Sequence, residues 1–157
     1  MGSHYKAALK VGDLIQSLLT YYVISVALHE WFHVMAGYIF GVKLTVVYKP
    51  DLTGFCKWVT WTTDPTALFV IGMAGGMGVA ATYMVAYLFE RDPEDRIAFL
   101  IIAPGHALYA VAEGFHLLGK CDLTVMQLMA IAGFALGTVI AVLKEVPRSG
   151  EQSSENT

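Results

Sequence analysis

The sequence predicts an all-α membrane bundle of four transmembrane helices, with a β-hairpin inserted between the first and second helix. The first observation is composition: 56% of the 157 residues are hydrophobic and 15% are charged, with a mean hydropathy of +0.57. A soluble domain averages about 25% charged residues. The second is four long apolar stretches, each able to supply the roughly 20 residues that a helix needs to cross a bilayer. The third is a short β-branched and aromatic segment between the first two stretches.

Composition also limits the partners. The formal net charge is −3 at pH 7, and no basic patch indicates nucleic acid binding, so the lipid bilayer and membrane proteins are the expected partners. The two cysteines, Cys56 and Cys121, are too few for a disulfide framework or a zinc ribbon. We therefore expect one integral, multi-pass membrane domain, with the cell membrane as its expected location.

The first span is expected at about residues 14–40. It follows an N-terminal segment, 1–13, in which Met1-Gly2-Ser3-His4 resembles an expression-tag remnant, so His4 is left out of the functional argument. Asp13 is placed to cap the helix and Gly41 is placed to end it.

Between residues 42 and 62 the pattern changes from helical to strand-like. Val42–Tyr48 and Phe55–Thr62 are rich in β-branched and aromatic residues, and Lys49–Gly54 between them has turn chemistry. This pattern predicts a β-hairpin over 42–62.

Three further spans are expected after aspartates that can cap a helix, at Asp64, Asp92 and Asp122. The spans lie at about 66–89, 97–118 and 123–143. With the first span and the hairpin they form one membrane core, 14–143, and a polar tail follows at 144–157. Four spans place both ends of the chain on one side of the membrane.

The second span contains small residues three and four positions apart within Gly72–Gly78. Such a face lets a neighbouring helix approach closely. The alternative is that the backbone here lies close to a substrate or a metal site. Both interpretations stay open at the level of the sequence.

The segment His29-Glu30-Trp31-Phe32-His33 reads H-E-x-x-H inside the first span. On a helix, residues four apart lie about 40° apart around the axis and one turn along it. His29 and His33 can therefore hold one Zn²⁺, and Glu30 lies near the same face, where it can reach a water on the ion. A glutamate among apolar residues is costly unless a metal, a partner or water offsets the charge. The alternative is a helix end at the membrane surface, with these side chains among lipid headgroups.

A catalytic zinc site has three protein ligands and one open position, and the third span offers His106, Glu113 and His116. Glu113 is the preferred third ligand, because a carboxylate deep in an apolar helix is a functional candidate by default. His106 shares its helix face and is the other candidate ligand, or else a catalytic hydrogen-bond donor to the reacting group. His116 lies near the helix end, where an interfacial position is expected. Pro104-Gly105 is expected to kink or unwind the helix just before His106.

These motifs resemble the site-2 protease family of intramembrane zinc metalloproteases over roughly residues 14–119. His29–Gly37, followed by Gly41-Val42-Lys43, resembles the family's first motif. Ala74-Gly75-Gly76 resembles its A-G-P element and Ala112-Glu113-Gly114 its L-D-G element. The resemblance implies His29 and His33 as zinc ligands, Glu30 as the water-activating base, and Glu113 in place of the family's Asp ligand.

The chain departs from the family pattern at Gly76 and Val79, which replace a Pro and an Asn. That Asn is thought to help hold the substrate backbone, and His106 is the nearest candidate to take over the task. The family usually places its site towards the cytosol, which puts the N-terminus outside. Lysine and arginine number six on the side of the chain ends and four on the other side, which favours cytoplasmic ends. The orientation therefore stays open.

We expect a zinc-dependent intramembrane endopeptidase with Zn²⁺ as its cofactor. It would cleave an extended segment of a membrane-protein or peptide substrate by attack of water assisted by Glu30, and an edge of the hairpin could hold that segment by strand addition. A regulatory membrane partner is a further candidate. Two alternatives are a non-catalytic, metal-stabilised scaffold and a small metal or ion transporter whose histidines and Glu113 line a polar path.

Overall fold

The computed structural model describes residues 2–51 and 53–145, and the surroundings of side chains from residue 10 onward. The described chain forms α1 (Gly2–Ile39), β1 (Leu44–Tyr48), β2 (Gly54–Trp58), α2 (Pro65–Phe89), α3 (Pro93–Leu117) and α4 (Leu123–Glu145). Each helix contains a stretch long and apolar enough to cross a membrane. The predicted four-helix bundle with an inserted hairpin is confirmed. Residues 146–157 of the predicted polar tail lie outside the described residues.

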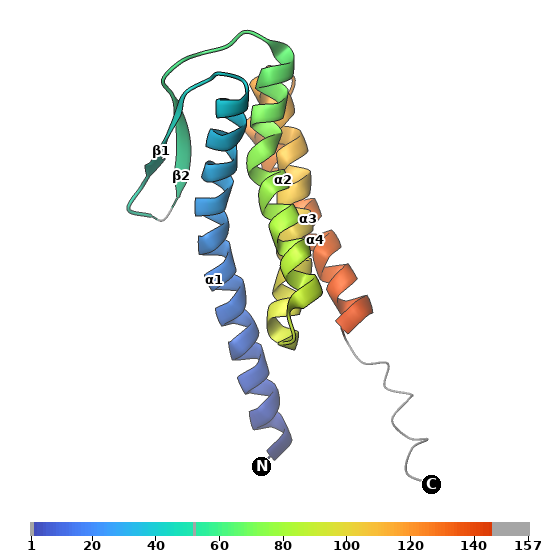
Figure 1. The fold of residues 1–157 in the computed structure, drawn as a ribbon. Coiled ribbons are helices and arrows are strands. Elements are labelled where there is room, and N and C mark those ends of the chain that lie inside the picture. The colour runs from blue at the N-terminus through green and yellow to red at the C-terminus, as the bar shows by residue number, and fades with distance from the viewer. Residues whose placement is uncertain (1, 52, 146–157) are drawn as a thin grey trace.

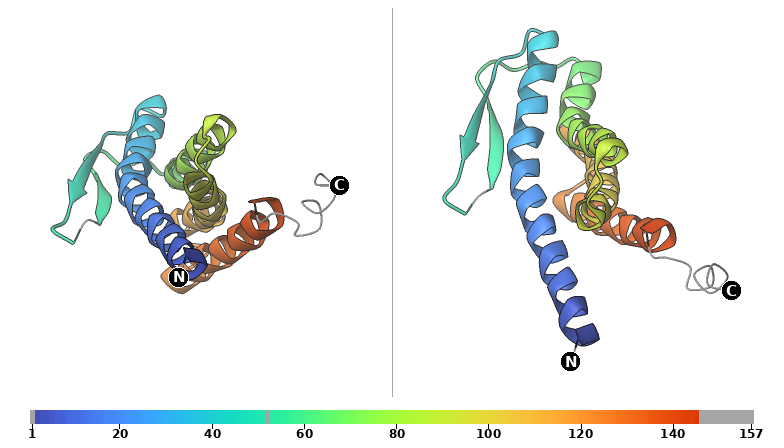
Figure 2. Two further views of the ribbon diagram at one scale, coloured as in Figure 1. Left: turned by 90° about the horizontal axis from the view of Figure 1, so that it is seen from below. Right: turned by 60° about the horizontal axis from the view of Figure 1, so that its bottom comes forward.

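The helices α2, α3 and α4 pack side by side, and α1 packs against α2 and α3 (Figure 1). The hairpin lies alongside α1 on the outside of the bundle, as the further views show (Figure 2). The start of α1 and the end of α4 lie at the same end of the bundle (Figure 1). Within the described residues, no Cα atom of α1 comes within 8 Å of a Cα atom of α4. The backbones of these two helices are therefore not closely packed against each other.

Helix α1 is longer than predicted. It begins at Gly2, so Asp13 lies inside the helix and the prediction that it caps the helix is wrong. The physical reason is that residues 5–10 include Ala, Leu and Lys, which are good helix formers, and extend the helix without a break. The end of α1 agrees with the prediction, because Gly41 has a left-handed φ of 68° and the Val42 N–H donates to the Gly37 carbonyl at 2.8 Å.

The other three helices begin where the capping aspartates predict. The Asp64 carboxylate accepts a hydrogen bond from the Thr66 N–H, and the Asp92 carboxylate accepts from the N–H groups of the first turn of α3. The Asp122 carboxylate accepts from the Val125 N–H at 2.9 Å. Helix α3 begins at Pro93, directly after its predicted cap, and Glu94 and Asp95 lie in its first turn, where acidic residues suit a helix N-terminus.

Helix α3 continues through Pro104 and Gly105 without interruption, so the predicted unwinding does not occur. Helix α4 packs tightly against this part of α3. A Cβ atom added to Gly133 of α4 would lie 2.7 Å from the Gly105 Cα. Glycine at 133 thus allows the two backbones to touch beside the proline, and this packing supports the helix where Pro104 removes a hydrogen bond.

The hairpin is shorter than the predicted 42–62. Strands β1 and β2 pair antiparallel, from Leu44 opposite Trp58 to Tyr48 opposite Gly54. Exposure alternates along β2: Phe55 and Lys57 are exposed, whereas Gly54, Cys56 and Trp58 are half-buried. The even-numbered face of β2 therefore faces the protein, as expected for a strand with one covered side.

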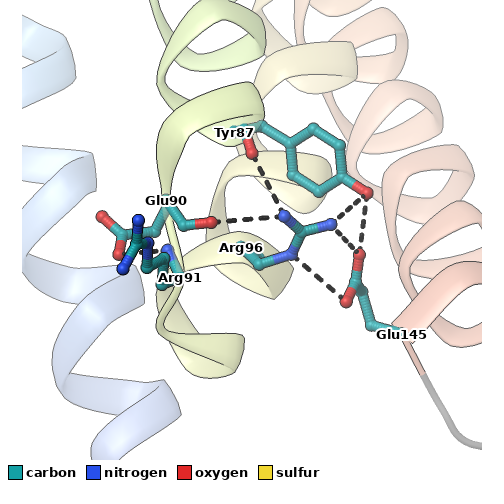
Figure 3. Close-up of polar contacts among 5 residues, drawn as sticks. All are labelled: Tyr87, Glu90, Arg91, Arg96 and Glu145. Atoms are coloured by element: carbon teal, nitrogen blue, oxygen red, sulfur yellow. Dashed lines mark hydrogen bonds and ion pairs between the residues drawn. The ribbon is translucent and has the colours of Figure 1, made fainter.

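A polar cluster joins three helices at the end of the bundle where α1 begins (Figures 1 and 3). Arg96 Nη2 of α3 donates to Glu145 Oε1 of α4 and to the Tyr87 hydroxyl of α2, both at 2.9 Å. The Tyr87 hydroxyl in turn donates to Glu145 Oε1 at 2.7 Å, and Arg96 Nη1 donates to the Glu90 carbonyl at 3.2 Å. Every charged group of this cluster has a partner, so it fixes the ends of α2 and α4 against the start of α3.

Candidate metal centre

The H-E-x-x-H motif and Glu113 come together between α1 and α3. His29 and His33 lie one turn apart on α1, and their Nε2 atoms are 2.9 Å from each other. Glu113 Oε2 lies 3.2 Å from His29 Nε2, and Glu113 Oε1 lies 3.4 Å from His33 Nε2. Both histidines are buried and Glu113 is half-buried. Each residue presents one donor atom to the same small volume, and the three residues form a group that could hold a metal ion.

Helix α2 fixes the orientation of His33. Its Nδ1–H donates a hydrogen bond to the backbone carbonyl of Ile71 at 2.6 Å. Because a carbonyl oxygen only accepts, Nδ1 carries the proton, and the neutral ring then has its lone pair on Nε2. That lone pair points towards His29 and Glu113. A metal-ligating histidine typically uses its other ring nitrogen in this way.

The glycine run of α2 has both of the roles considered from the sequence. A Cβ atom added to Gly75 would lie 2.7 Å from His29 Nε2 and would also overlap the His33 ring. The backbone of α2 therefore lies directly against the two imidazoles. A Cβ atom added to Gly72 would lie 2.8 Å from the Gly114 Cα of α3. One position makes room for the histidines, and the other lets two helices approach.

The residues present fit a divalent cation. The Nε2 atoms of His29 and His33 lie 2.9 Å apart with the Glu113 carboxylate beside them, and the buried Glu113 Oε2 has no hydrogen-bond partner among the described residues. A cation between the three donors would satisfy all of them at once. A cavity of about 220 Å³ borders the group. The geometry therefore provides three protein donors and room for a further ligand.

Glu30 faces this cavity and is buried, with 6% of its surface exposed. Its Oε2 atom has no hydrogen-bond partner among the described residues. Strand β2 covers it: a Cβ atom added to Gly54 would lie 3.0 Å from Glu30 Cγ, and the Cys56 thiol donates to the Glu30 carbonyl at 3.4 Å. Burial, and then the neighbouring Glu30, raise the pKa of the Cys56 thiol, which keeps it neutral.

His106 lies beside the three-donor group but outside it. Its ring centroid is 5.9 Å from that of His29, and both ring nitrogens are buried without a partner among the described residues. Glu113 occupies the third donor position, so the geometry favours Glu113 over His106 as third ligand. His106 remains a candidate donor to a bound group. His116 lies away from the site, where its Nδ1–H donates to the Cys121 carbonyl at 2.9 Å.

Tyr109 is a residue of the site that the sequence pattern did not identify. Its ring centroid lies 5.7 Å from that of His29, and it borders the cavity beside the metal group. The spacing of His106, Tyr109 and Glu113 on α3 places them on one helix face, so this spacing is a signal that could have found it. No comparable signal identifies the Ile71 carbonyl, because a backbone acceptor leaves no pattern in the sequence.

The arrangement is chemically specific: two imidazoles and a carboxylate converge, a second carboxylate faces the same space, and all of them lie within helices long enough to cross a membrane. The described chain is therefore a multi-pass bundle by the length and composition of its helices, with a group that could hold a metal ion. In comparisons with known proteins, no protein-family model, no curated protein and no solved structure matches this chain.

Proposed function

We propose that this chain is a zinc-dependent intramembrane endopeptidase that resembles the site-2 protease family. The observation that carries the proposal is the buried Glu30 carboxylate, whose Oε2 has no hydrogen-bond partner in the described part of the chain and which faces the cavity beside His29, His33 and Glu113. A structural zinc site is closed by four protein ligands, whereas a catalytic site has three and an open position. Three donors with a free carboxylate beside them suit catalysis.

In this proposal His29, His33 and Glu113 hold Zn²⁺, since two histidines and a glutamate are a known catalytic zinc donor set. The bound ion supplies a Lewis acid for the scissile carbonyl and for water. Glu30 takes the proton from the attacking water and passes it to the nitrogen of the leaving amine. His106, whose ring nitrogens have no partner within the described residues, donates a hydrogen bond to the substrate backbone.

The separation of α1 and α4 supports access from the lipid. No Cα atom of α1 lies within 8 Å of a Cα atom of α4 in the described chain, and the site lies on the inner side of α1, which packs against α2 and α3. The hairpin supports an extended substrate, because β2 lies against Glu30 and borders the cavity. A helix hides its carbonyls in backbone hydrogen bonds, whereas an extended segment exposes them and can pair with a strand edge.

Replacement of the Glu30 carboxylate by an amide distinguishes an endopeptidase from a metal-stabilised scaffold and from a transporter. The purified full chain is loaded with zinc in liposomes and incubated with a panel of synthetic transmembrane peptides, and mass spectrometry identifies the products. We expect the wild-type chain to cleave, and Glu30→Gln to lower the rate at least 100-fold while zinc content stays at one ion per chain. A metal-stabilised scaffold would show no cleavage in either protein. A transporter would instead move zinc across the membrane in a Glu30-dependent manner.

Glu94→Gln is the matched control. It makes the same chemical change in the first turn of α3, at the opposite end of the bundle from the site, and should leave the rate unchanged. Cleavage that persists in Glu30→Gln with zinc bound would refute the proposed role of Glu30.

A further inference from the structure

A second cavity, of about 310 Å³, lies between α1, α3 and α4 and adjoins the candidate metal centre. It shares His29, Glu30, Gly54 and Tyr109 with the cavity beside the metal group. The two spaces therefore meet at the position where a reacting carbonyl would lie. We propose that this second cavity is a specificity pocket, which receives a large apolar side chain of the substrate residue next to the scissile bond. The inference rests on the proposed function and names a feature of its substrate.

The walls of the pocket combine polar and apolar side chains. Its polar members include Glu30, His29 and His106, and its apolar members include Val26, Ala130 and Phe134. The Phe134 ring packs at a steep angle to the His106 ring, with 6.5 Å between centroids. A wall that offers both polar groups and apolar surface matches an amino-acid residue with a polar backbone amide and an apolar side chain.

The size of the pocket indicates a large side chain. An apolar cavity of about 150 Å³ in another protein accommodates a benzene molecule, and this pocket is about 310 Å³. A phenyl or isobutyl group would fit with room to spare, whereas a methyl group would leave most of the apolar wall without contact. Burial of such a group against apolar walls stabilises a complex, so the pocket should discriminate clearly between large and small side chains.

The position of the pocket favours a side chain over a lipid tail. The pocket lies between α1 and α4, and no Cα atom of α1 lies within 8 Å of one of α4 in the described chain, so we expect apolar groups to enter it from the membrane. An acyl chain, however, offers no donor or acceptor to Glu30 Oε2 or to the His106 ring nitrogens, which are buried without a partner among the residues that the structure describes. A peptide brings an amide to these atoms and satisfies them.

Ala130 on α4 decides the volume of the pocket. It is half-buried, lines the cavity, and has a small side chain that a larger one can replace. Gly105, on the facing side, is less suitable, because a Cβ atom there would lie 2.6 Å from the Phe134 ring. Ala130→Phe should fill the pocket, and Ala130→Leu should fill it in part with less risk to folding. Ala135→Phe adds the same bulk at an exposed position of the same helix and is the control.

The test measures binding of small hydroxamates, which chelate zinc, to the zinc-loaded full chain in detergent. Three N-acylated amino-acid hydroxamates differ only in side chain: hydrogen, isobutyl or benzyl. The readout is the dissociation constant from calorimetry, which needs no turnover. We expect the isobutyl and benzyl compounds to bind wild-type protein at least 10-fold more tightly than the glycine compound. In Ala130→Phe this ratio should fall to about one, in Ala130→Leu it should be intermediate, and in Ala135→Phe it should stay as in wild type.

Equal binding of the three compounds to wild-type protein, or a ratio unchanged in both Ala130 variants, would overturn the proposal. Binding of octanohydroxamate as tight as that of the benzyl compound would overturn it too, in favour of an acyl chain as occupant. A failure of the pocket is distinguishable from a failure of the proposed function. If the pocket is wrong, cleavage that depends on Glu30 persists without a side-chain preference. If the chain binds zinc but is not a protease, the hydroxamates still report the preference.

Discussion

His33 Nδ1 and the backbone oxygen of Ile71 lie 2.6 Å apart, and their hydrogen bond joins α1 to α2 at the candidate metal centre. The bond sets which nitrogen of His33 faces His29 and Glu113. The metal group therefore depends on three helices, although only two of them supply donor atoms. Packing of α2 against α1 should control metal affinity as directly as the ligands do.

Gly75→Ala tests this dependence on α2. The added methyl group would lie 2.7 Å from His29 Nε2, so either the imidazoles or helix α2 must move. The three donor atoms then no longer face the same position. We expect zinc affinity to fall at least 10-fold, the range found when groups that orient ligands are removed, as measured by competition with a fluorescent chelator. Gly12→Ala is the control, because a Cβ atom there meets nothing within 4 Å. Equal zinc affinity in Gly75→Ala and wild type would show that α2 does not constrain the site.

Removal of the metal should destabilise the fold. Without an ion, the Glu113 carboxylate and two imidazoles remain close together and buried between helices. Ligand linkage predicts that chelation, from free zinc about 100-fold above the dissociation constant, costs about 2.7 kcal/mol of unfolding free energy. Thermal unfolding in detergent should show a lower Tm in the presence of a chelator, and added zinc should restore it. The same chelator should not change the Tm of His29→Ala. A Tm shift of equal size in that variant would mean that zinc binds outside the group of His29, His33 and Glu113.

The sequence predicted the helices and most of the metal group because both depend on local patterns. Hydropathy located four spans, and the four-residue spacing of His29 and His33 placed both rings on one helix face. The energetic cost of a carboxylate in an apolar helix singled out Glu113. The predicted start of α1 was wrong, because the polar residues near the N-terminus do not end a helix when the segment is rich in helix-forming residues. The Ile71 carbonyl and the position of His106 depend on how the helices pack, which no single segment encodes.

The hairpin edge can be tested with proline. Lys43 and Lys49 flank β1, and each forms a backbone hydrogen bond to the opposite strand: the Lys49 N–H donates to the Thr53 carbonyl, and the Lys43 carbonyl accepts from the Val59 N–H. In an antiparallel sheet, such hydrogen-bonded pairs alternate with pairs that are not hydrogen-bonded. The Cys56 N–H of β2 and the Val46 N–H of β1 therefore point away from the ladder. If substrate pairs with β2, Cys56→Pro should lower the cleavage rate at least 10-fold and leave zinc content unchanged.

Two controls accompany this variant. Cys56→Ala keeps the N–H and should retain most of the rate, which separates loss of the backbone donor from loss of the thiol. Val46→Pro removes the outward donor of β1, the strand that does not cover Glu30, and should have little effect. Normal rates in both proline variants would eliminate strand addition.

The polar cluster of Figure 3 should contribute to stability and not to metal binding. Tyr87→Phe removes one hydroxyl, which donates to Glu145 and accepts from Arg96, while keeping the ring beneath the guanidinium at 4.3 Å. We expect a loss of about 1 kcal/mol in unfolding free energy, typical of one hydrogen bond, with zinc affinity unchanged. Denaturation in mixed micelles measures the first quantity and chelator competition the second. A fall in zinc affinity would mean that the two ends of the bundle are coupled.

X-ray absorption at the zinc edge tests the central claim most directly, because it reports the atoms around the ion in the purified, zinc-loaded chain. The account predicts one zinc per chain, with two imidazole nitrogens and carboxylate or water oxygen at about 2.0–2.2 Å. His29→Ala and Glu113→Ala should each abolish this spectrum, whereas His116→Ala should preserve it. Absence of bound zinc in wild-type protein, or a sulfur shell at about 2.3 Å from Cys56 or Cys121, would contradict a metal centre built from His29, His33 and Glu113.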